Sequence, residues 1–372
     1  MKVFFLYLKA FSFTGGIEKF NRSFLKALHE LSVDGFIDAD ASSSYDTVTD
    51  EKYFPRNRFT GFGGRRKAFV FSSVLKCFKY DAVVIGHINL AVVACIMKKI
   101  RPSLRLVVVT HGIEVWKTQS GYKKKLLEQA DIILSVSQFT KEKILEFNPG
   151  IDAARIKIFP NTIDPYFKAP STFGKPEYLL KRYNLDSNAA ILITVTRLSF
   201  SEKYKGYDNT ISMMNEIVAA NSNVRYLICG KADQSEKERI VSLMEENNVA
   251  DKIILTGFVK DEELIDHYLL GDVFVMPSKK EGFGIVFIEA LACGLKVIAG
   301  SKDGSVDALK NGELGMLIDP DNKEELALAI SQSLGNGHYD PAAMQQKVFE
   351  AFGFNKYKER LRNYLTNEAD AS

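Results

Sequence analysis

Two carboxylates stand eight positions apart in the stretch Glu281-Gly-Phe-Gly-Ile-Val-Phe-Ile-Glu289, and every residue between them is glycine or apolar. Gly282 and Gly284 leave the backbone bare where an apolar helix is expected to begin, so free amides and the positive end of the helix dipole can face an anion. A carboxylate inside an apolar helix, such as Glu289, needs hydrogen-bond donors. Ribose hydroxyls would supply them. Glu289 lies about 7 Å along the helix axis from the first turn, a rise comparable to the span from a diphosphate to its ribose. A buried helix whose glutamate pairs with a neighbour is the alternative, and the preceding glycines favour the nucleotide.

Further candidate residues share one feature, which is that they end a predicted strand or lie in the loop just after it. These are Gly15-Gly16 after Val3–Leu8, His111-Gly112 after Leu104–Thr110, Arg197 after Ala190–Thr196, Lys205-Gly206 in the loop that follows, and Pro277-Ser-Lys-Lys-Glu281-Gly-Phe-Gly284 after Val273–Met276. Each alone is a weak signal, since a glycine pair is usually a turn and an isolated cation is usually solvated. Ligands of parallel sheets bind beyond the carboxyl ends of the strands, so the shared position indicates a binding site.

The elements that must position these residues alternate along the chain. Short apolar runs rich in Val and Ile are followed by amphipathic stretches, the pattern of βαβ units. The further strands expected are Ala82–Gly86, Ile132–Val136, Ile156–Phe159, Val224–Cys229, Ile253–Thr256, Lys296–Ala299 and Met316–Ile318. The expected helices are Glu18–Leu31, Arg66–Phe78, Leu90–Lys99, Lys123–Gln129, Lys141–Phe147, Tyr207–Ala220, Ser235–Asn247, Asp261–Leu269, Ile285–Cys293, Lys323–Gly335 and one or two within Pro341–Leu365. The polar segment Asp38–Asp50 is predicted to be a loop.

The alternation breaks at Pro160-Asn-Thr-Ile-Asp-Pro165 and restarts near Ala190. A chain of 372 residues is too long for one ordinary core. We therefore predict an α/β fold of two Rossmann-like, doubly wound domains that face each other across a cleft. The expected domains are residues 1–165 and residues 166–345, followed by a C-terminal helix and tail at 346–372.

Composition is that of a soluble globular enzyme, with 46% hydrophobic and 26% charged residues. The four cysteines are far apart and the five histidines form no pair at metal-ligand spacing, so we expect reduced thiols and neither a disulfide frame nor a zinc site. Lys9 interrupts the apolar start too early for a signal peptide, and the uncharged stretch Ala82–Met97 is shorter than the ~20 residues of a membrane span. A cytoplasmic protein is expected, with a peripheral position at the inner face of a membrane left open.

The net charge of +3 is unevenly spread, because residues 1–160 hold 25 Lys or Arg against 15 Asp or Glu, while residues 161–372 hold 24 against 31. Such an asymmetry suggests that the first half meets an anionic surface. The basic and aromatic stretch 53–80 includes Arg65, Arg66 and Lys67, and interleaved cations and phenylalanines suit an anionic membrane. A helix with a solvated basic face is the alternative. Nucleic acid is not expected as a partner, because no recognised binding module accompanies the patch.

Together these residues resemble the family 4 retaining glycosyltransferases of the GT-B fold, which move a sugar from a nucleotide-sugar to an acceptor. The most specific match is Glu281-x7-Glu289 with Pro277-Ser278 before it and Ala290…Gly294 after it. Supporting matches are Thr196-Arg-Leu198 with Lys205-Gly206, Gly257-Phe-Val259, Gly15-Gly16 and His111-Gly112. The resemblance implies donor binding mainly in the second domain, acceptor binding mainly in the first, and a C-terminal helix that crosses back to the first domain.

The resemblance also implies a role for each matching residue. Arg197 and Lys205 would clamp the diphosphate, which stabilises the leaving group as the glycosidic bond breaks. Glu281 would bind the sugar ring, Glu289 the ribose, and His111 would reach the donor sugar from the first domain. The remaining donor-binding residues would be Gly15 and Gly16 over the phosphates, Phe258 and Val259 at the base, and Ser278, Gly282, Phe283, Gly284 and Ile285 around phosphate and sugar.

Two features of the sequence depart from the family pattern. Asp303-Gly304-Ser305-Val306-Asp307 stands where the family commonly has Gly-Gly-x-x-Glu, which leaves the role of Asp307 open, and Lys203 is a second candidate for the lysine of the clamp.

Asp38-Ala-Asp40 and Asp319-Pro-Asp321 match the short DxD pattern of metal-dependent transferases, but no further carboxylate cluster accompanies either pair. We expect no metal, because two cations and two helix ends can offset the charge of a diphosphate.

The sequence thus predicts a retaining, metal-independent hexosyltransferase that needs no cofactor and uses a UDP- or GDP-sugar as its donor substrate. The expected acceptor is a lipid-linked or polysaccharide glycan in cell-envelope or capsule synthesis. No carboxylate nucleophile is identifiable on the acceptor side, which favours same-face attack with the leaving phosphate as base. The alternatives are a GT-B-fold nucleotide-sugar epimerase or phosphorylase and a non-catalytic nucleotide-sugar-binding protein. A dehydrogenase is disfavoured, because no GxGxxG follows a strand.

Overall fold

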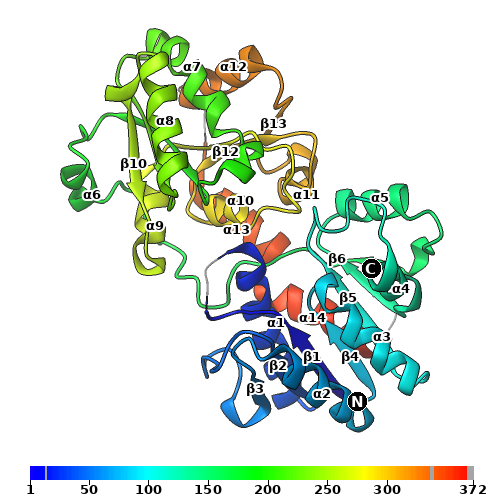
Figure 1. Cartoon of the computed structure of the whole chain (residues 1–372). Helices are drawn as coiled ribbons and strands as arrows, with labels where there is room; N and C mark the ends of the chain where they lie inside the picture. The colour runs from blue at the N-terminus through cyan, green and yellow to red at the C-terminus, as the bar shows by residue number, and fades with distance from the viewer. Residues whose placement is uncertain (13–14, 336–338, 367–372) are drawn as a thin grey trace. The chain divides into compact units, whose positions relative to one another are not determined.

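The structure is a computed structural model of the chain and describes residues 1–12, 15–335 and 339–366. The chain folds into two compact units (Figure 1). Unit 1 comprises Met1–Tyr166 and the described part of Phe352–Ser372, and unit 2 comprises Phe167–Ala351. Each unit has its own parallel sheet.

The described residues of unit 1 contain a seven-stranded sheet in the order β3-β2-β1-β4-β5-β6-β7. Its strands are β1 (Lys2–Tyr7), β2 (Asp38–Ser43), β3 (Phe59–Gly61), β4 (Ala82–Ile85), β5 (Arg105–Thr110), β6 (Ile132–Ser135) and β7 (Ile156–Ile158). The order reverses where β1 lies beside β4, with Val3 opposite Ala82. Ligands of open α/β sheets bind at the carboxyl ends of strands at such a switch point.

Helices cover both faces of this sheet. They are α1 (Gly16–Val33), α2 (Arg66–Lys76), α3 (Ala91–Ile100), α4 (Gly121–Gln129), α5 (Gln138–Phe147) and α14 (Phe354–Thr366). Side chains alternate along a strand, so Phe4 of β1 packs in the core under α2, α3 and α4, while Phe5 packs against Phe24 of α1 with ring centroids 4.6 Å apart. Lys358 of α14 lies 2.9 Å from Glu30 of α1, which confirms that the C-terminal helix returns to the first half of the chain.

The described residues of unit 2 contain a six-stranded sheet in the order β10-β9-β8-β11-β12-β13. Its strands are β8 (Ala190–Val195), β9 (Val224–Cys229), β10 (Ile253–Gly257), β11 (Val273–Met276), β12 (Lys296–Gly300) and β13 (Met316–Ile318). The order reverses between β8 and β11, where Leu192 lies opposite Val273. Unit 2 therefore has the same kind of switch point as unit 1.

Helices also cover both faces of the second sheet. They are α6 (Glu177–Arg182), α7 (Tyr207–Ala220), α8 (Gln234–Glu246), α9 (Asp261–Leu270), α10 (Ile285–Ala292), α11 (Ser305–Ala308), α12 (Lys323–Leu334) and α13 (Pro341–Phe352). Leu192 and Val275 belong to the core formed with α7, α8 and α12. On the other face, Phe274 contacts Tyr268 of α9 and Phe287 of α10, with ring centroids 6.1 and 5.7 Å apart. Glu289 belongs to α10 on this second face, whereas Glu281 lies in the loop between β11 and α10.

The predicted strands are confirmed to within one residue at each end, but the prediction of a loop at Asp38–Asp50 is wrong in its first half. Residues Asp38–Ser43 form β2, which pairs in parallel with β1. The alternation of the segment places Ala39 and Ala41 in the core, while Arg58 forms ion pairs with Asp38 and Asp40. A strand with acidic side chains is stable here because a cation compensates them. Strand β3 and helices α6 and α11 were also not predicted.

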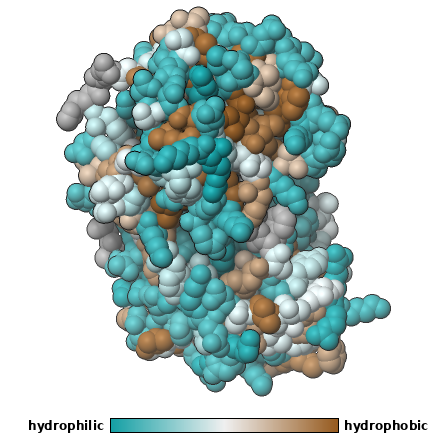
Figure 2. Space-filling model, turned by 90° about the vertical axis from the view of Figure 1, so that its left-hand side faces the viewer, coloured by the Kyte–Doolittle hydropathy of each residue, from teal (hydrophilic) through white to brown (hydrophobic). Residues whose placement is uncertain are grey.

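Figure 2 shows one side of the molecule, which is largely hydrophilic with a brown hydrophobic patch in its upper part.

Three apolar side chains at α2 of unit 1 are more than half exposed. Phe71 and Leu75 lie on α2 and Phe78 lies just after its end, and they are 68%, 56% and 59% exposed. None of the helices in the described parts of the chain combines the length and the apolar character of a membrane-spanning helix.

Candidate active site

The candidate site of unit 2 lies at the carboxyl ends of β8 and β11, the strands at which the strand order reverses. Arg197 follows β8, and Lys205 ends a 3₁₀ segment, Phe200–Lys205, before α7 begins. The loop 277–284 joins β11 to α10. Both parallel strands end at the same edge of the sheet, so their loops lie next to each other although they are far apart in the sequence.

Lys205 forms an ion pair with Glu281, and the two side chains are only 14% and 13% exposed. The loops carrying them touch, because the Lys279 amide donates to the Tyr204 carbonyl at 2.9 Å. Gly206 permits this approach: its φ is +84°, and a Cβ there would lie 2.3 Å from the Pro277 carbonyl oxygen. A side chain at this position would be disfavoured both by the dihedral angle and by the contact. The structure therefore brings together two of the predicted catalytic residues.

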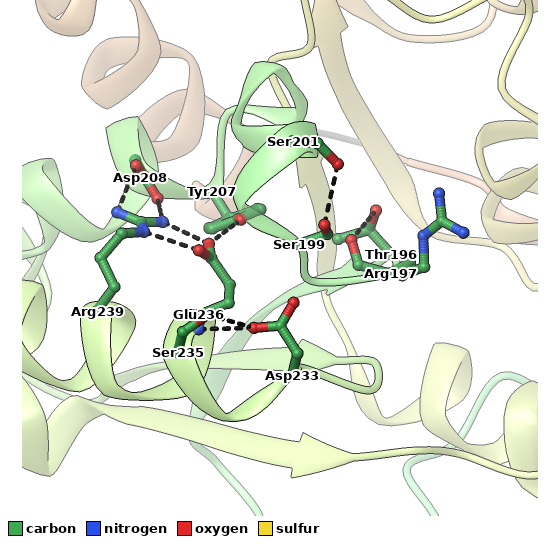
Figure 3. Close-up of polar contacts among 10 residues, drawn as sticks. All are labelled: Thr196, Arg197, Ser199, Ser201, Tyr207, Asp208, Asp233, Ser235, Glu236 and Arg239. Atoms are coloured by element: carbon green, nitrogen blue, oxygen red, sulfur yellow. Dashed lines mark hydrogen bonds and ion pairs between the residues drawn. The ribbon is translucent and has the colours of Figure 1, made fainter.

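Arg197 is the second predicted cation, and it forms an ion pair with Glu202 of the same loop. Its side chain is 55% exposed, whereas that of Glu202 is 13% exposed. Figure 3 shows the guanidinium pointing away from the polar network around Arg239. An ion pair with an exposed member is worth about 0–1 kcal/mol, so an anionic ligand can compete with Glu202 for the guanidinium.

The polar network in Figure 3 fixes the first turn of α7, which begins two residues after Lys205. Glu236 is fully buried, accepts a hydrogen bond from the Tyr207 hydroxyl and pairs with Arg239 at 2.7 Å. Arg239 also donates to both carboxylate oxygens of Asp208, at 2.9 and 2.7 Å. Burial alone would raise the pKa of Glu236, but the hydrogen bonds from Arg239 and Tyr207 outweigh it and hold the pKa below its usual value. The loop that carries Lys205 thus ends on a rigid helix start.

The loop after β11 is held by a buried carboxylate from the loop after β12. Asp303 Oδ2 accepts hydrogen bonds from the Ser278 hydroxyl and from the Glu281 amide, both at 2.7 Å. Its Oδ1 accepts from the Ser305 amide at 2.9 Å. Burial raises the pKa of Asp303 to about 6, although these hydrogen bonds act in the opposite direction.

Glu289 lies in the middle of α10, and its side chain is almost completely buried. The hydroxyl of Tyr268 on α9 donates to Glu289 Oε2 at 3.0 Å. Burial and the nearby negative charge of Glu289 raise the pKa of Tyr268 well above its usual value. The sequence left open that Glu289 pairs with a neighbouring side chain. Tyr268 is such a neighbour.

The other predicted donor-binding residues of unit 2 lie at ends of elements. Ile285 begins α10, whose N-cap residue Gly284 offers no side-chain hydrogen bond to the first turn, and the Phe283 side chain is buried. Phe258 and Val259 follow β10, and the ring of Phe258 is 61% exposed. An uncapped helix start and an exposed aromatic ring are suitable for an anion and for a planar base.

In unit 1, the loop after β1 is held in a similar way. Asp46, which is buried, accepts from the amides of Ala10 and Ser12 at 2.7 and 3.0 Å, from the Phe11 amide at 3.3 Å and from the Ser43 hydroxyl at 3.0 Å. The chain then reaches Gly15 and Gly16 at the start of α1. A Cβ at Gly16 would meet nothing within 4 Å.

His111 follows β5 in unit 1 and is half-buried. Its Nε2 lies 2.8 Å from the Gly86 carbonyl oxygen. Because a carbonyl only accepts, Nε2 carries the proton and Nδ1 is the acceptor when the ring is neutral. His87 stacks on His111 with ring centroids 5.9 Å apart, and burial together with the charge of His111 lowers the pKa of His87 to about 3.

Two family models match the chain, one for each half. The model described as Glycosyltransferase Family 4 matches residues 14–167, and the model described as Glycosyl transferases group 1 matches residues 177–349. Together they include every candidate residue described above. The chain belongs to the family 4 glycosyltransferases.

Two relatives of the chain are named as mannosyltransferases. A GDP-mannose-dependent alpha-(1-6)-phosphatidylinositol monomannoside mannosyltransferase from Mycobacterium tuberculosis is 30% identical over 242 residues, which are 62% of this chain and 60% of that protein. The present chain thus matches about 60% of the length of that relative. A GDP-mannose-dependent monoacylated alpha-(1-6)-phosphatidylinositol monomannoside mannosyltransferase from Corynebacterium glutamicum is 23% identical over 95% of both chains.

Solved structures share the GT-B fold. HepE from Anabaena, solved in complex with UDP, superposes with a TM-score of 0.80 at 19% identity and covers 99% of this chain and 100% of its own. A lipopolysaccharide outer core galactosyltransferase, WaaB, superposes with a TM-score of 0.73, also at 19% identity, and covers 99% and 100% of the two chains. These likenesses support the GT-B architecture of the family member described here.

The three residues Arg65, Arg66 and Lys67, predicted to meet a membrane or an acceptor, are all exposed at the start of α2. Arg66 donates to the Tyr45 hydroxyl at 2.9 Å, and Arg65 donates to the Phe62 carbonyl at 3.1 Å. Both arginines are therefore held at the surface, directly before the exposed Lys67 in the chain.

Each of the two DxD pairs has a cationic partner. Asp38 and Asp40 pair with Arg58, while Asp319 and Asp321 lie 2.6 and 3.1 Å from Lys302. In the described part of the chain, no three His, Cys, Asp or Glu side chains are arranged to hold a metal ion.

Three side chains that shape the site were missed from the sequence, namely Asp46, Tyr268 and Asp303. Asp303 was read only as a departure from the Gly-Gly pattern of the family. Its contact with the Ser305 amide is local, but its other two hydrogen-bond partners, Ser278 and Glu281, become neighbours only when β11 and β12 pair.

Proposed function

We propose that the protein transfers a hexosyl unit from a UDP- or GDP-sugar to a lipid-linked or polysaccharide acceptor in cell-envelope or capsule synthesis. The observation that carries the proposal is the pairing of Lys205 with Glu281 at the switch point of unit 2, in the loop that leads into the uncapped start of α10. Cations and helix amides bind a diphosphate, and a carboxylate accepts hydrogen bonds from sugar hydroxyls. The names of the relatives, which mention GDP-mannose, and the UDP bound to HepE support this assignment.

Lys205 and Arg197 would act on the leaving group. As the bond between the anomeric carbon and the diphosphate oxygen breaks, negative charge grows on the diphosphate, and fixed cations stabilise that charge. The donor would compete with Glu281 for Lys205 and with Glu202 for Arg197. Gly15, Gly16 and His111 of unit 1 keep the roles that the family implies for them, contacts with phosphate and sugar.

We assign different ligand groups to the two glutamates of the motif. Replacing Glu289 with Gln should weaken the binding of free nucleoside diphosphate, because the ribose loses its carboxylate partner. Glu281→Gln should spare nucleoside diphosphate binding and weaken binding of the intact nucleotide-sugar. Calorimetry with UDP, GDP, UDP-glucose and GDP-mannose measures all four affinities.

Tyr268→Phe is the matched control for Glu289→Gln, because it removes the hydroxyl that contacts Glu289 and keeps the carboxylate. Near-normal binding of nucleoside diphosphate by Tyr268→Phe is expected. If both variants lose the same affinity, Glu289 serves the packing of α9 against α10 and the ribose assignment fails.

We propose that transfer retains the anomeric configuration and needs no metal. The acceptor hydroxyl would attack on the face that the diphosphate leaves, and its proton would go to the departing phosphate. The compensation of both DxD pairs by Arg58 and Lys302 supports metal-independence. Proton NMR of the first product formed tests the configuration, and an assay in excess EDTA tests the metal requirement.

We propose further that the start of α2 meets an anionic membrane that carries the acceptor, which would make the protein a cytoplasmic enzyme peripheral to that membrane. Lys67, Phe71, Leu75 and Phe78 follow one another at helical spacing, so cation and apolar side chains share one side of the helix. Cations attract anionic headgroups at about 1 kcal/mol each, while the phenylalanines and leucine can enter the interface.

Vesicle flotation tests this membrane contact. Reversing Arg65, Arg66 and Lys67 to Glu should lower binding to phosphatidylglycerol vesicles at least about 100-fold, and salt should weaken wild-type binding. The control reverses the exposed Lys181, Lys231 and Lys237 of unit 2, which changes the net charge equally. If both triple variants lose binding alike, the attraction is general and the α2 patch has no special role.

Product analysis tests the central proposal. Incubation with GDP-mannose or UDP-glucose and a lipid extract should yield a glycosylated acceptor together with free nucleoside diphosphate. Epimerised nucleotide-sugar would identify an epimerase instead, and sugar phosphate would identify a phosphorylase. Binding of a nucleotide-sugar without any product in the presence of acceptors would identify a binding protein.

A further inference from the structure

We propose that Asp303 is a positioning residue for the transfer reaction, because its carboxylate holds the backbone of Glu281 and so fixes the direction in which the Glu281 side chain meets Lys205 and the donor sugar. Its catalytic consequence rests on the proposed function. The loop contact itself does not, and it can be measured separately.

The backbone of Glu281 is bound on both sides by the segment that contains Asp303. The Glu281 amide donates to Asp303 Oδ2 at 2.7 Å, and the Glu281 carbonyl accepts from the Gly304 amide at 2.7 Å. The same carboxylate oxygen accepts from the Ser278 hydroxyl at the start of the loop. Two backbone bonds and a side-chain bond therefore fix the loop on either side of its charged residue.

The segment is packed so closely against the loop that Gly304 has no room for a side chain. A Cβ at Gly304 would lie 2.2 Å from the Gly282 carbonyl oxygen and 2.7 Å from that of Glu281. A movement of the Asp303 segment would therefore be transmitted to the loop at Gly282, next to Glu281. The carboxylate and the glycine after it act together as one clamp.

The chemistry of the position requires a carboxylate. Three donors converge on Asp303, namely one hydroxyl and two backbone amides, and an ionised carboxylate accepts from all of them. An asparagine of the same shape has one oxygen, so in either orientation its NH₂ group would face a backbone amide. Leaving a buried donor unsatisfied costs more than the hydrogen bond contributes when made.

The charged groups on the surrounding elements are Glu281 and its partner Lys205 on the packed loops, Asp307 on α11, and Lys302 beside it, which is engaged with Asp319 and Asp321. The carboxylate is buried, and burial raises its pKa to about 6 although the hydrogen bonds that it accepts act in the opposite direction. Below that pH the carboxyl gains a proton and presents a donor where three donors meet. The clamp is expected to be complete above pH 6 and weakened below it.

Amide hydrogen exchange over residues 278–284 is the direct test. Asp303→Ala, which removes both acceptor oxygens, should lower the protection of the Glu281 amide about tenfold or more, and Asp303→Asn should do so at whichever of the Glu281 and Ser305 amides faces its NH₂ group. The control is Asp321→Asn, which removes an exposed partner of Lys279 in the same loop but no backbone bond. The intact mass of the variant is checked, because an asparagine before Gly304 can deamidate to aspartate.

Transfer kinetics extend the test to catalysis. Asp303→Asn should lower kcat/KM by about 10- to 100-fold, since displacing a positioned group by a fraction of an ångström has effects of that size. The fall of the wild-type rate below pH 6 should be absent from the pH profile of the variant. Asp321→Asn should keep both the rate and the profile.

The outcomes separate this inference from the proposed function. Unchanged exchange and unchanged kinetics in Asp303→Asn overturn the positioning role. If the wild type transfers no sugar, the proposed function fails while exchange still decides whether the clamp exists. If the variant does not fold, exchange of the wild type at pH 5 and pH 7.5, corrected for the intrinsic rate, decides, and equal protection at the two values overturns the inference.

Discussion

The loop after β1 in unit 1 and the loop after β11 in unit 2 are built on the same plan. Each leaves a strand at the switch point of its sheet and enters a helix through glycine, α1 after Gly15 and α10 after Gly284. Each is held by a buried aspartate from the loop after the neighbouring strand, Asp46 after β2 and Asp303 after β12.

The two loops differ in how much space surrounds them. Asp46 binds three successive amides, and a Cβ at Gly16 would meet nothing within 4 Å. Asp303 binds one amide of the loop after β11, that of Glu281, and a Cβ at Gly304 would collide with the backbone of the same loop. Hydrogen bonds therefore set the shape of the first loop, whereas close packing adds to them in the second. We infer that the second loop tolerates substitution less well.

The largest expected effect concerns the cation that faces the second loop. Lys205→Ala should lower the transfer rate by about 10²–10³-fold, because a fixed charge near the leaving group is lost. The control is Lys203→Ala, which removes a lysine from the same segment that lies over the Phe200 ring. Steady-state kinetics measure both. Equal losses would mean that Lys203 contributes to the clamp as much as Lys205.

The next effect concerns the pH dependence of stability at Asp303. The pKa of Asp303 is raised by burial from 3.8 to about 6 in the folded protein. The folded state then binds more protons than the unfolded state, so this residue contributes stability below pH ~4 that is lost as pH rises through ~6, by about 3 kcal/mol. The free energy of unfolding of wild type minus that of Asp303→Asn, measured from pH 4 to pH 7, should fall accordingly. A flat difference would contradict the assignment.

A matched pair of glycines tests the difference in space. Gly304→Ala should destabilise unit 2 by about 2–3 kcal/mol, because its methyl group meets a backbone carbonyl and the chain must shift. Gly16→Ala should change stability by less than about 0.5 kcal/mol, since the site is open and alanine favours a helix. Denaturation followed by circular dichroism measures both. If Gly16→Ala keeps stability but slows transfer, its backbone approaches the donor.

A smaller loss of stability than that of Gly304→Ala is expected at the first aspartate. Asp46→Asn should destabilise unit 1 by about 2 kcal/mol, because some of the backbone amides that donate to the Asp46 carboxylate lose their acceptor. The chain has a single tryptophan, Trp116 in unit 1, so its fluorescence during urea unfolding reports on this unit. Binding of nucleoside diphosphate should weaken as well, because the loop that Asp46 holds leads to Gly15 and Gly16, which are proposed to contact the phosphates. Unchanged binding would contradict that role of the two glycines.

The sequence predicted the regular elements better than their partners. The apolar runs of β8, β11 and β12 were recognised because a buried parallel strand is apolar along its whole length. Strand β2 was missed because its Asp-Ala-Asp-Ala pattern is compensated by Arg58, which lies about 20 positions away in the chain. No local signal contains that information.

By itself, the sequence determined the two sheets, the strand ends at which Arg197, Lys205 and Glu281 lie, and the family. Periodicity and short motifs involve residues that are close together in the chain, so they can be recognised from the sequence alone. The tertiary structure decided which side chains support the site. Asp303 reaches Glu281 across 22 positions and Tyr268 reaches Glu289 across 21, and such contacts exist only after the neighbouring elements have packed.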